Sequence, residues 1–278
     1  MIRLGEYQTL EVHREMPQGL YLIEKDGDEE ILMPQRFVTD DMKIGDMVEV
    51  FVYCDSNDRD MATTEKPFLI VNEFAHLKVN SVNDIGAFCD WGTSKELLVP
   101  FRNQSRPMSE GNYYVVHMYW DEVSDRLVGT TKLKNFLKQT ADKEFELGQE
   151  VDLMVYGSID IGYKVIINGE YAGLVYKDEA WKDMRIGHQC KGYIKPIRED
   201  GKIDVSLTPI GYKSIVGNEK VVLDKLTGAG GFLPYSDKSD PDDIRREFGL
   251  SKKLFKKVIG GLYRQKLITI EPEGIKTT

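Results

Sequence analysis

The chain has 278 residues, of which 41% are hydrophobic and 30% are charged, and its formal net charge is −9. This composition is that of an ordinary globular protein, and the length suggests two domains of usual size or three to four small ones. The acidic balance excludes a uniformly basic nucleic-acid coat. No apolar run approaches the roughly 18 residues of a membrane span, so we expect no membrane partner. Three widely spaced cysteines predict reduced thiols in the cytoplasm rather than a disulfide framework.

Two sets of glycines mark a threefold repeat. The first glycine of each repeat opens a similar apolar phrase, and a second glycine follows it after 26, 25 and 25 residues. The two sets are Gly19, Gly86 and Gly162, and Gly45, Gly111 and Gly187. From the first repeat to the second, the first glycines are 67 residues apart and the second glycines 66. From the second repeat to the third, both sets of glycines are 76 residues apart. Because two independent markers keep step, we predict three copies of one structural unit.

Each repeat is patterned as a set of short β-strands. Asp26-Gly27 separates two apolar runs in the first repeat, and Asn168-Gly169 does so in the third. Both dipeptides are typical of tight hairpin turns, because both central residues need a positive φ. A β-rich run follows the second glycine of each repeat, and one more strand closes it. Five strands in about 65 residues predict a small closed barrel, which leaves no exposed sheet edge.

Residues 218–278 change to helix-period patterning and carry 12 basic and 9 acidic side chains. The predicted elements are a helix over 218–226, a helix over 239–249, a basic helix over 251–267 and a hairpin-like wing over 268–276. Asn218 and Ser251 are the predicted caps of the first and third helices, and Pro241 lies in the first turn of the second. Helix, turn, basic helix and wing are the layout of a winged helix-turn-helix.

Three phrases in the repeats resemble a known domain family. Gly-Ala-Phe-Cys at 86–89, Gly-Leu-Val-Tyr at 173–176 and Ile-Asp-Val-Ser-Leu at 203–207 are similar to motifs of S1-type RNA-binding OB barrels. Three such barrels before a basic helical tail resemble the conserved virulence factor B family, in which S1-like domains precede a winged helix. The resemblance implies a mostly β protein. Its domains would be three tandem S1-like OB β-barrels at 1–66, 67–135 and 146–210, followed by an α+β winged helix-turn-helix domain at 218–278.

Aromatic residues on the barrel strands are predicted to stack on RNA bases. Phe88 shares one face of its strand with Asp90, and the side that carries a carboxylate is the expected solvent face. The alternative is that Phe88 fills the barrel core. Tyr21 holds the matching position in the first repeat, and Tyr176 matches the position of an S1 histidine, so both are predicted to stack as well.

Basic residues of the barrels are predicted to contact phosphates. Arg59 and Arg126 follow acidic turns, where S1 barrels place a phosphate-reaching basic residue. The alternative for both is a surface salt bridge with Asp55 or Asp121. Lys164 replaces the aromatic residue on the second strand of the third repeat, and its ammonium is expected to reach a phosphate.

The third predicted helix is the most basic part of the chain, since residues 251–266 contain six basic side chains and no acidic one. Helical spacing places its lysines away from the apolar side, where their mutual repulsion favours an anionic partner. The alternative is a solvated face without a partner. The predicted nucleic-acid contacts are Lys252, Lys253, Lys256, Lys257 and Arg264.

Catalysis has little support in the sequence. The four histidines are isolated, and no Walker A, GxSxG or HExxH motif occurs. The glycine-rich segment 228–231 lacks the Gly-Lys-Ser/Thr of a phosphate loop and is predicted to be a flexible linker. A carboxylate-based nuclease that uses Mg²⁺ is the less favoured alternative. We predict no catalytic residue, no metal and no cofactor.

The sequence therefore predicts a non-enzymatic, cytoplasmic protein that binds single-stranded RNA along its barrels. The winged helix would be an electrostatic anchor for RNA or another nucleic acid. The resemblance implies post-transcriptional control of gene expression, including virulence-associated genes. The alternative is a protein-interaction scaffold, supported by the net charge of −12 on residues 1–217. No motif identifies the target RNA, its sequence preference, the dominant barrel or the oligomeric state.

Overall fold

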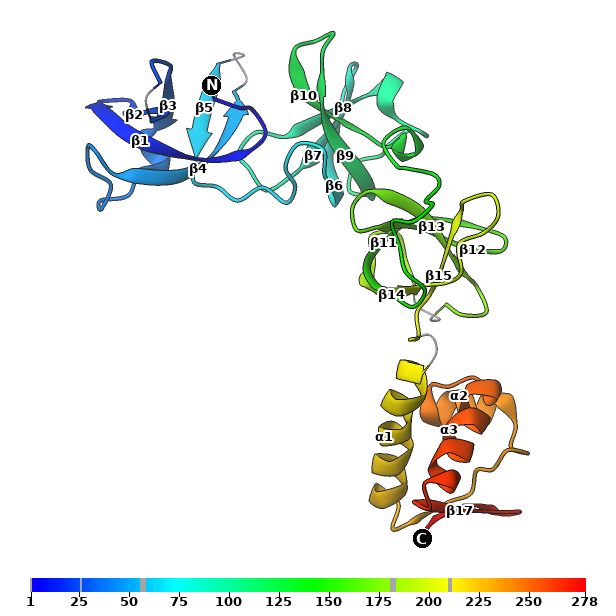
Figure 1. Ribbon diagram of the computed structural model, residues 1–278. Helices are drawn as coiled ribbons and strands as arrows, with labels where there is room; N and C mark the ends of the chain where they lie inside the picture. The colour runs from blue at the N-terminus through cyan, green and yellow to red at the C-terminus, as the bar shows by residue number, and fades with distance from the viewer. Residues whose placement is uncertain (1, 26, 56–58, 181–183, 210–211) are drawn as a thin grey trace. The chain divides into compact units, whose positions relative to one another are not determined.

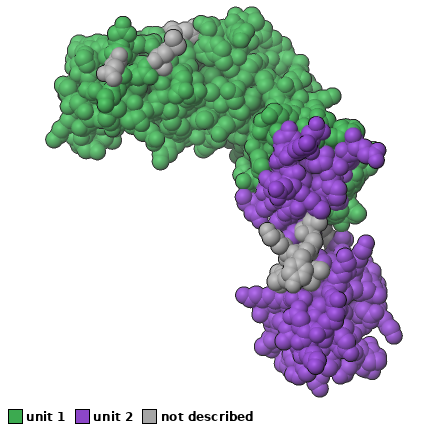
Figure 2. Space-filling view, viewed as in Figure 1, with its two compact units in different colours: residues 1–141, 152–190, 200–202 green, residues 142–151, 191–199, 203–278 purple. Residues whose placement is uncertain are grey.

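The computed structural model describes residues 2–25, 27–55, 59–180, 184–209 and 212–278. The chain divides into two compact units (Figure 2). The first consists of residues 1–141, 152–190 and 200–202, and the second of residues 142–151, 191–199 and 203–278. Strands dominate from the N-terminus to β15, and the three α-helices follow (Figure 1). The protein is therefore mostly β, as the sequence predicts.

Each repeat folds as a five-stranded barrel unit. The strands of the first are β1 (Tyr7–Met16), β2 (Gly19–Ile23), β3 (Glu30–Pro34), β4 (Met47–Cys54) and β5 (Asp60–Thr63). Those of the second are β6 (Phe74–Val82), β7 (Gly86–Asp90), β8 (Leu97–Pro100), β9 (Tyr113–Asp121) and β10 (Arg126–Thr130). Those of the third are β11 (Glu150–Ile159), β12 (Gly162–Ile167), β13 (Tyr171–Tyr176), β14 (Gln189–Ile194) and β15 (Ile203–Ser206).

The middle repeat differs from its neighbours in how it closes. The first and third are closed barrels with the orders β1-β2-β3-β5-β4 and β11-β12-β13-β15-β14. The second is a sheet of order β10-β9-β6-β7-β8, so β8 and β10 are its hydrogen-bonding edges. These edges still lie side by side, because a Cβ built on Gly129 of β10 would stand 2.7 Å from Cγ2 of Val99 in β8. The second barrel is thus closed by side chains rather than by a backbone ladder.

A shared backbone device confirms the threefold repeat. Val12, Val79 and Val155 each precede a bulge in the first strand of their barrel. The amide of each valine donates to the carbonyl of the residue that follows the second glycine of its repeat. The amide of that glycine donates to the carbonyl of the valine, and all six distances are 2.7–2.9 Å. The valines are 67 and 76 residues apart, which matches the offsets of the first glycines.

The first glycine of each repeat stands where two strands approach closely. A Cβ added to Gly19, Gly86 or Gly162 would lie 2.0, 2.4 or 2.2 Å from a carbonyl oxygen of the next strand. Only a residue without a side chain permits this approach. The sequence repeat therefore records a requirement of the backbone.

The predicted hairpin turn of the third repeat is confirmed. Asn168 and Gly169 have φ values of 50° and 72°, positive at both positions as this turn requires. Asp26, in the turn predicted for the first repeat, lies outside the described residues.

The winged helix predicted at the C-terminus is also confirmed. It contains α1 (Tyr212–Gly228), β16 (Phe232–Leu233), α2 (Pro241–Phe248), α3 (Lys252–Arg264), β17 (Ile268–Glu271) and β18 (Gly274–Thr277). The strands form a sheet of order β16-β18-β17. The Asp240 side chain caps α2, Gly249 ends it with a φ of 69°, and Ser251 caps α3. Phe255 of α3 is fully buried in the core of this domain.

Two local predictions in this domain are wrong. The helix expected to begin at an Asn218 cap begins at Tyr212, so Asn218 lies inside α1. Burial of Val222 and Leu226 stabilises the helix, whereas an interior asparagine costs less than about 0.7 kcal/mol. Segment 228–231 is not a flexible linker, because its last residue donates to the Leu226 carbonyl at 2.8 Å and accepts from the β18 backbone.

Candidate nucleic-acid interface

Phe88 lies on the outer face of β7. Its neighbours Ala87 and Cys89 are completely buried, whereas Phe88 is half-buried. Across the sheet it faces Ser81 of β6 on one side and Leu98 of β8 on the other. The alternation along the strand therefore directs the ring out of the barrel core, as the sequence predicts.

The Phe88 ring lines a cavity of about 230 Å³. Both β8 and β10 contribute lining residues, so the cavity lies where the ladder of the second barrel is not closed. Ile85, Leu98 and Leu127 make much of its lining apolar. Its volume is below the roughly 300–1,000 Å³ of drug-sized pockets, which suits one nucleobase better than a larger ligand.

Two basic side chains line the same cavity. Arg126, the first residue of β10, lines the cavity from a strand distant in sequence from Phe88. The ammonium of Lys95 donates to the carbonyl oxygens of Cys54 and Asp55 at 2.6 and 2.7 Å, so it is held in place. An aromatic residue and an arginine that line one cavity are the residue types that single-strand binders use for a base and its phosphate.

Trp91 is a structural residue beneath this cavity. It is only 3% exposed, and its ring meets that of Phe51 edge-on at 5.6 Å between centroids. Its indole N–H donates to the Lys95 carbonyl. Trp91 therefore belongs to the hydrophobic cluster that joins the first two repeats.

Tyr21 occupies the position in the first repeat that Phe88 occupies in the second, but its surroundings differ. The Arg14 guanidinium lies 3.8 Å from the centroid of the Tyr21 ring. Glu30 holds that guanidinium, with 2.7 Å between Nη2 of Arg14 and Oε2 of Glu30. One face of the ring is thus covered by a cation–π contact, so a base could reach only the other face unless Arg14 moved.

Arg59 forms a salt bridge with Asp55, which was the alternative to a phosphate contact in the sequence. Its Nε and Nη2 atoms lie 3.0 and 2.6 Å from Oδ2 of Asp55. The Arg59 side chain is 63% exposed, and exposed pairs of this kind contribute only about 0–1 kcal/mol. The pair can therefore open for a phosphate at little cost. Residues 56–58 of the same turn lie outside the described residues.

The acidic turn of the second repeat is arranged differently. Asp121 pairs with Arg102, with 2.6 Å between Nη2 and Oδ2, and accepts a hydrogen bond from Ser124. Arg126 faces Asp121 in the strand register, while its side chain reaches the cavity.

In the third repeat the predicted residues lie apart from Phe88. Lys164 is exposed on β12 and lines a second cavity, of about 640 Å³. Tyr176 is half-buried at the end of β13, opposite Gly162. The structure therefore brings Phe88 and Arg126 together and places Lys164 elsewhere.

The basic residues of α3 fall into two groups. Lys253 and Lys257 are exposed, and within the described ranges no carboxylate lies within ion-pair distance of either. Lys256 lies 3.4 Å from a carboxylate in the loop before α2. Lys252 and Arg264 donate to backbone carbonyls, at 3.4 and 3.2 Å. Two fully available cations thus stand beside three that have weak partners.

The side chains described by the structure offer no metal centre. No group of three or more histidine, cysteine or acidic side chains is placed to hold an ion among them.

His117 lies between Phe74 and Phe136, at centroid distances of 4.4 and 4.3 Å, and burial lowers the pKa of His117 to about 4. None of the described helices is long and apolar enough to cross a membrane.

The apolar residues of the Phe88 cavity were not predicted from the sequence. Leu98 lies between fully buried neighbours on β8 and points outward by the same alternation that places Phe88. That pattern could have identified it. Lys95 and Ile85 lie in loops, where alternation gives no signal.

The chain consists of small β-barrels followed by a winged helix that contains a basic helix. One barrel carries a cavity lined by an aromatic residue and an arginine. These are nucleic-acid-binding domain types. Residues 4–65 match the S1 domain, and residues 220–276 match the CvfB-like winged helix domain. The chain belongs to the conserved virulence factor B family.

Relatives match the chain over nearly its whole length. It is 30% identical to the uncharacterized protein YitL of Bacillus subtilis, over 95% of this chain and 90% of that one. It is 28% identical to conserved virulence factor B of Staphylococcus epidermidis, over 99% and 95%. A crystal structure of a multidomain protein with nucleic acid binding domains from Streptococcus pneumoniae is 24% identical, covering 99% of this chain and 98% of that one with a TM-score of 0.43.

Proposed function

We propose that this protein binds single-stranded RNA, with a base stacked on Phe88 and the adjoining phosphate held by Arg126. The observation that carries the proposal is the convergence of these two side chains on one apolar cavity of about 230 Å³. Stacking of a base on an aromatic ring contributes about 1–3 kcal/mol. A guanidinium suits phosphate oxygens because its fork of donors can engage two of them at once.

Other residues would extend the bound strand along the protein. Tyr21 and Tyr176 would stack further bases, and Arg59 and Lys164 would meet further phosphates. The lysines of α3 would add an electrostatic anchor for RNA or another nucleic acid, supported by the exposure of Lys253. Because these contacts hold RNA without chemistry, the protein would act as a non-enzyme.

Family membership supports a role in post-transcriptional control of gene expression, including virulence-associated genes, since relatives are named conserved virulence factor B. The place of action would be the cytoplasm, where an odd number of widely spaced cysteines, three in this chain, is expected to stay as thiols.

The test is fluorescence anisotropy of labelled single-stranded RNA, single-stranded DNA and duplex RNA with the full chain and two variants. Single-stranded RNA should bind most tightly. Phe88→Ala should weaken it about 5- to 150-fold, which is the loss of one stacked base. Phe101→Ala is the matched control, because Phe101 is 49% exposed on the same barrel and lines neither cavity.

Thermal unfolding of both variants separates binding from stability. Since the Phe88 ring is half-buried, its removal should lower the melting temperature by a few degrees only. Equal weakening by both substitutions would contradict the assignment of Phe88. Absence of RNA binding by the unaltered chain would favour the protein-scaffold alternative, for which the net charge of −12 on residues 1–217 speaks.

A further inference from the structure

The second and third barrels are held together by the connecting segment, residues 131–149, which runs from the end of β10 to the start of β11. Leu133 and Leu137 are buried in one hydrophobic cluster with Val115 of β9 and Ile166 of β12. The backbone of Lys138 exchanges two hydrogen bonds, of 3.0 and 2.8 Å, with residues at the start of β13. This segment therefore packs on one barrel and pairs with the other, and the residues that make these contacts lie in the first compact unit.

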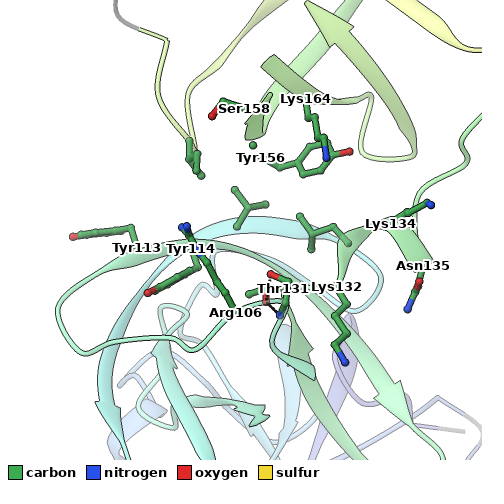
Figure 3. A pocket seen from close by; sticks show the side chains of 15 residues that line it. Arg106, Tyr113, Tyr114, Thr131, Lys132, Lys134, Asn135, Tyr156, Ser158 and Lys164 are labelled. Atoms are coloured by element: carbon green, nitrogen blue, oxygen red, sulfur yellow. Dashed lines mark hydrogen bonds between the residues drawn. The ribbon is translucent and has the colours of Figure 1, made fainter. Parts of the chain in front are cut away.

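A cleft of about 640 Å³ lies between these two barrels. In Figure 3, Tyr156, Ser158 and Lys164 of the third barrel face the residues of the second across an open space. Lys134 comes from the connecting segment at the side of this space. The buried cluster of Leu133 and Leu137 packs against both Val115 of the second barrel and Ile166 of the third, next to this cleft.

The charge of the cleft is entirely positive. Its lining includes four cations and no acidic residue, in a chain whose net charge is −9. All four cations are exposed, and within the described part of the chain none has a carboxylate within 4 Å. They are Arg106, Lys132, Lys134 and Lys164. Four unneutralised cations around one cleft repel each other, and a polyanion would relieve that repulsion.

Planar rings and neutral polar groups lie among these cations. Tyr113 is 55% exposed, and its ring lies 5.3 Å from the His76 ring between centroids, with 40° between the ring planes. The Arg106 guanidinium lies 5.7 Å from the centroid of Tyr114. Ser158 and Asn135 present polar side chains to solvent at the cleft. Rings can stack on bases, and hydroxyl and amide groups can bond a ribose 2′-OH.

We propose that this cleft binds the sugar-phosphate backbone of single-stranded RNA and is a second, phosphate-directed site separate from the Phe88 cavity. The proposal rests on the proposed function, because it assigns a path for the same ligand. An acidic peptide would also neutralise the cations, but it has no base to stack on the exposed Tyr113 ring and no ribose to bond the neutral polar groups. The two sites would have different roles: the Phe88 cavity holds one base and its adjoining phosphate, and the cleft holds further phosphates of the strand.

The test measures the salt dependence of binding of a fluorescein-labelled oligouridylate. One variant replaces the cleft cations together, Arg106→Gln, Lys132→Gln, Lys134→Gln and Lys164→Gln. The control variant removes the same charge from exposed lysines that line neither cavity, Lys25→Gln, Lys43→Gln, Lys66→Gln and Lys143→Gln. Each phosphate contact on a single strand contributes about 0.7 to the slope of log K against log salt.

If two to four of the cleft cations touch phosphates, the slope should fall by about 1.4–2.8 in the cleft variant and by much less in the control. Phe88→Ala should weaken RNA binding by the same factor in the cleft variant as in the unaltered chain. If the fourfold cleft variant fails to fold, Lys134→Glu serves instead, since this side chain is exposed and its reversal should weaken binding at low salt.

The outcomes separate the two proposals. Binding by the unaltered chain with an unchanged slope in the cleft variant would overturn the cleft site and leave the proposed function standing. Equal slope changes in the cleft and control variants would also overturn the cleft site, because the effect would then be one of net charge. No binding by the unaltered chain would overturn both.

Discussion

Replacing Gly162 with alanine should destabilise the third barrel much more than replacing Gly157 in the neighbouring strand. A Cβ on Gly162 would lie 2.2 Å from the carbonyl oxygen of Val175 and 3.1 Å from the Cα of Tyr176. Both are backbone atoms, so β12 and β13 would have to move apart by about an ångström. On Gly157 the nearest atom is Cδ of Lys164 at 3.7 Å, an ordinary contact with a flexible chain.

The magnitudes follow from these two surroundings. Overpacking costs about 1–3 kcal/mol, and a strained ladder loses about 1 kcal/mol for each weakened hydrogen bond. We therefore expect Gly162→Ala to cost about 2–4 kcal/mol. Gly157→Ala should lie within about 0.5 kcal/mol of neutral, or stabilise slightly, because alanine restricts the unfolded chain.

Native-state hydrogen exchange of the β12 and β13 amides is the appropriate assay, since it reports on the third barrel separately from the other domains. Protection should fall in Gly162→Ala and persist in Gly157→Ala. Equal protection in the two variants would mean that the strands separate without cost, and the close-approach reasoning would be wrong.

Three further outcomes test the electrostatic and burial arguments. Replacing the four lysines of α3 with glutamine should lower the slope of log K against log salt for RNA binding by about 1.4–2.8, if two to four of them touch phosphates, and should preserve base preference; an unchanged slope would refute the anchor. Burial lowers the pKa of His117 to about 4, below its unfolded value of about 6.5. Stability measured by urea denaturation should therefore be fully present above pH 6.5 and decline toward pH 4, and His117→Phe should flatten that decline. Burial raises the pKa of the Cys89 thiol to about 12, so iodoacetamide should label Cys54 and Cys190 first by mass spectrometry; early labelling of Cys89 would count against its burial.

The features best predicted from the sequence are those fixed by local backbone chemistry. The spacing of Gly86 and Gly162 reflects a strand approach that no side chain allows, so it could be read without a structure. The Asn168-Gly169 turn and the Ser251 cap follow from the same kind of constraint. Where the cap rested on one residue, as at Asn218, the predicted boundary was wrong, because that residue lies inside α1.

Apart from the Arg59–Asp55 pair within one turn, side-chain partners could not be predicted, because they depend on register and on neighbouring domains. Tyr21 and Phe88 hold matching positions, yet Arg14 covers the first ring and a cavity adjoins the second. Lys132 and Lys134 follow the last strand of the second repeat and look like part of a linker in the sequence. They line a cleft only because the third barrel packs against that segment.

The connecting segment limits how this family can be taken apart or recombined. A fragment that ends at residue 135 would lose Leu137 and leave Val115 without its cover. A fragment that begins at residue 146 would lose Lys138 and leave the start of β13 with an open edge, which invites association between copies. Although the second and third barrels repeat one structural unit, the segment between them packs on both, so they are not interchangeable modules. A gene fusion or deletion that keeps both folded must carry them as a pair, with the segment between them intact.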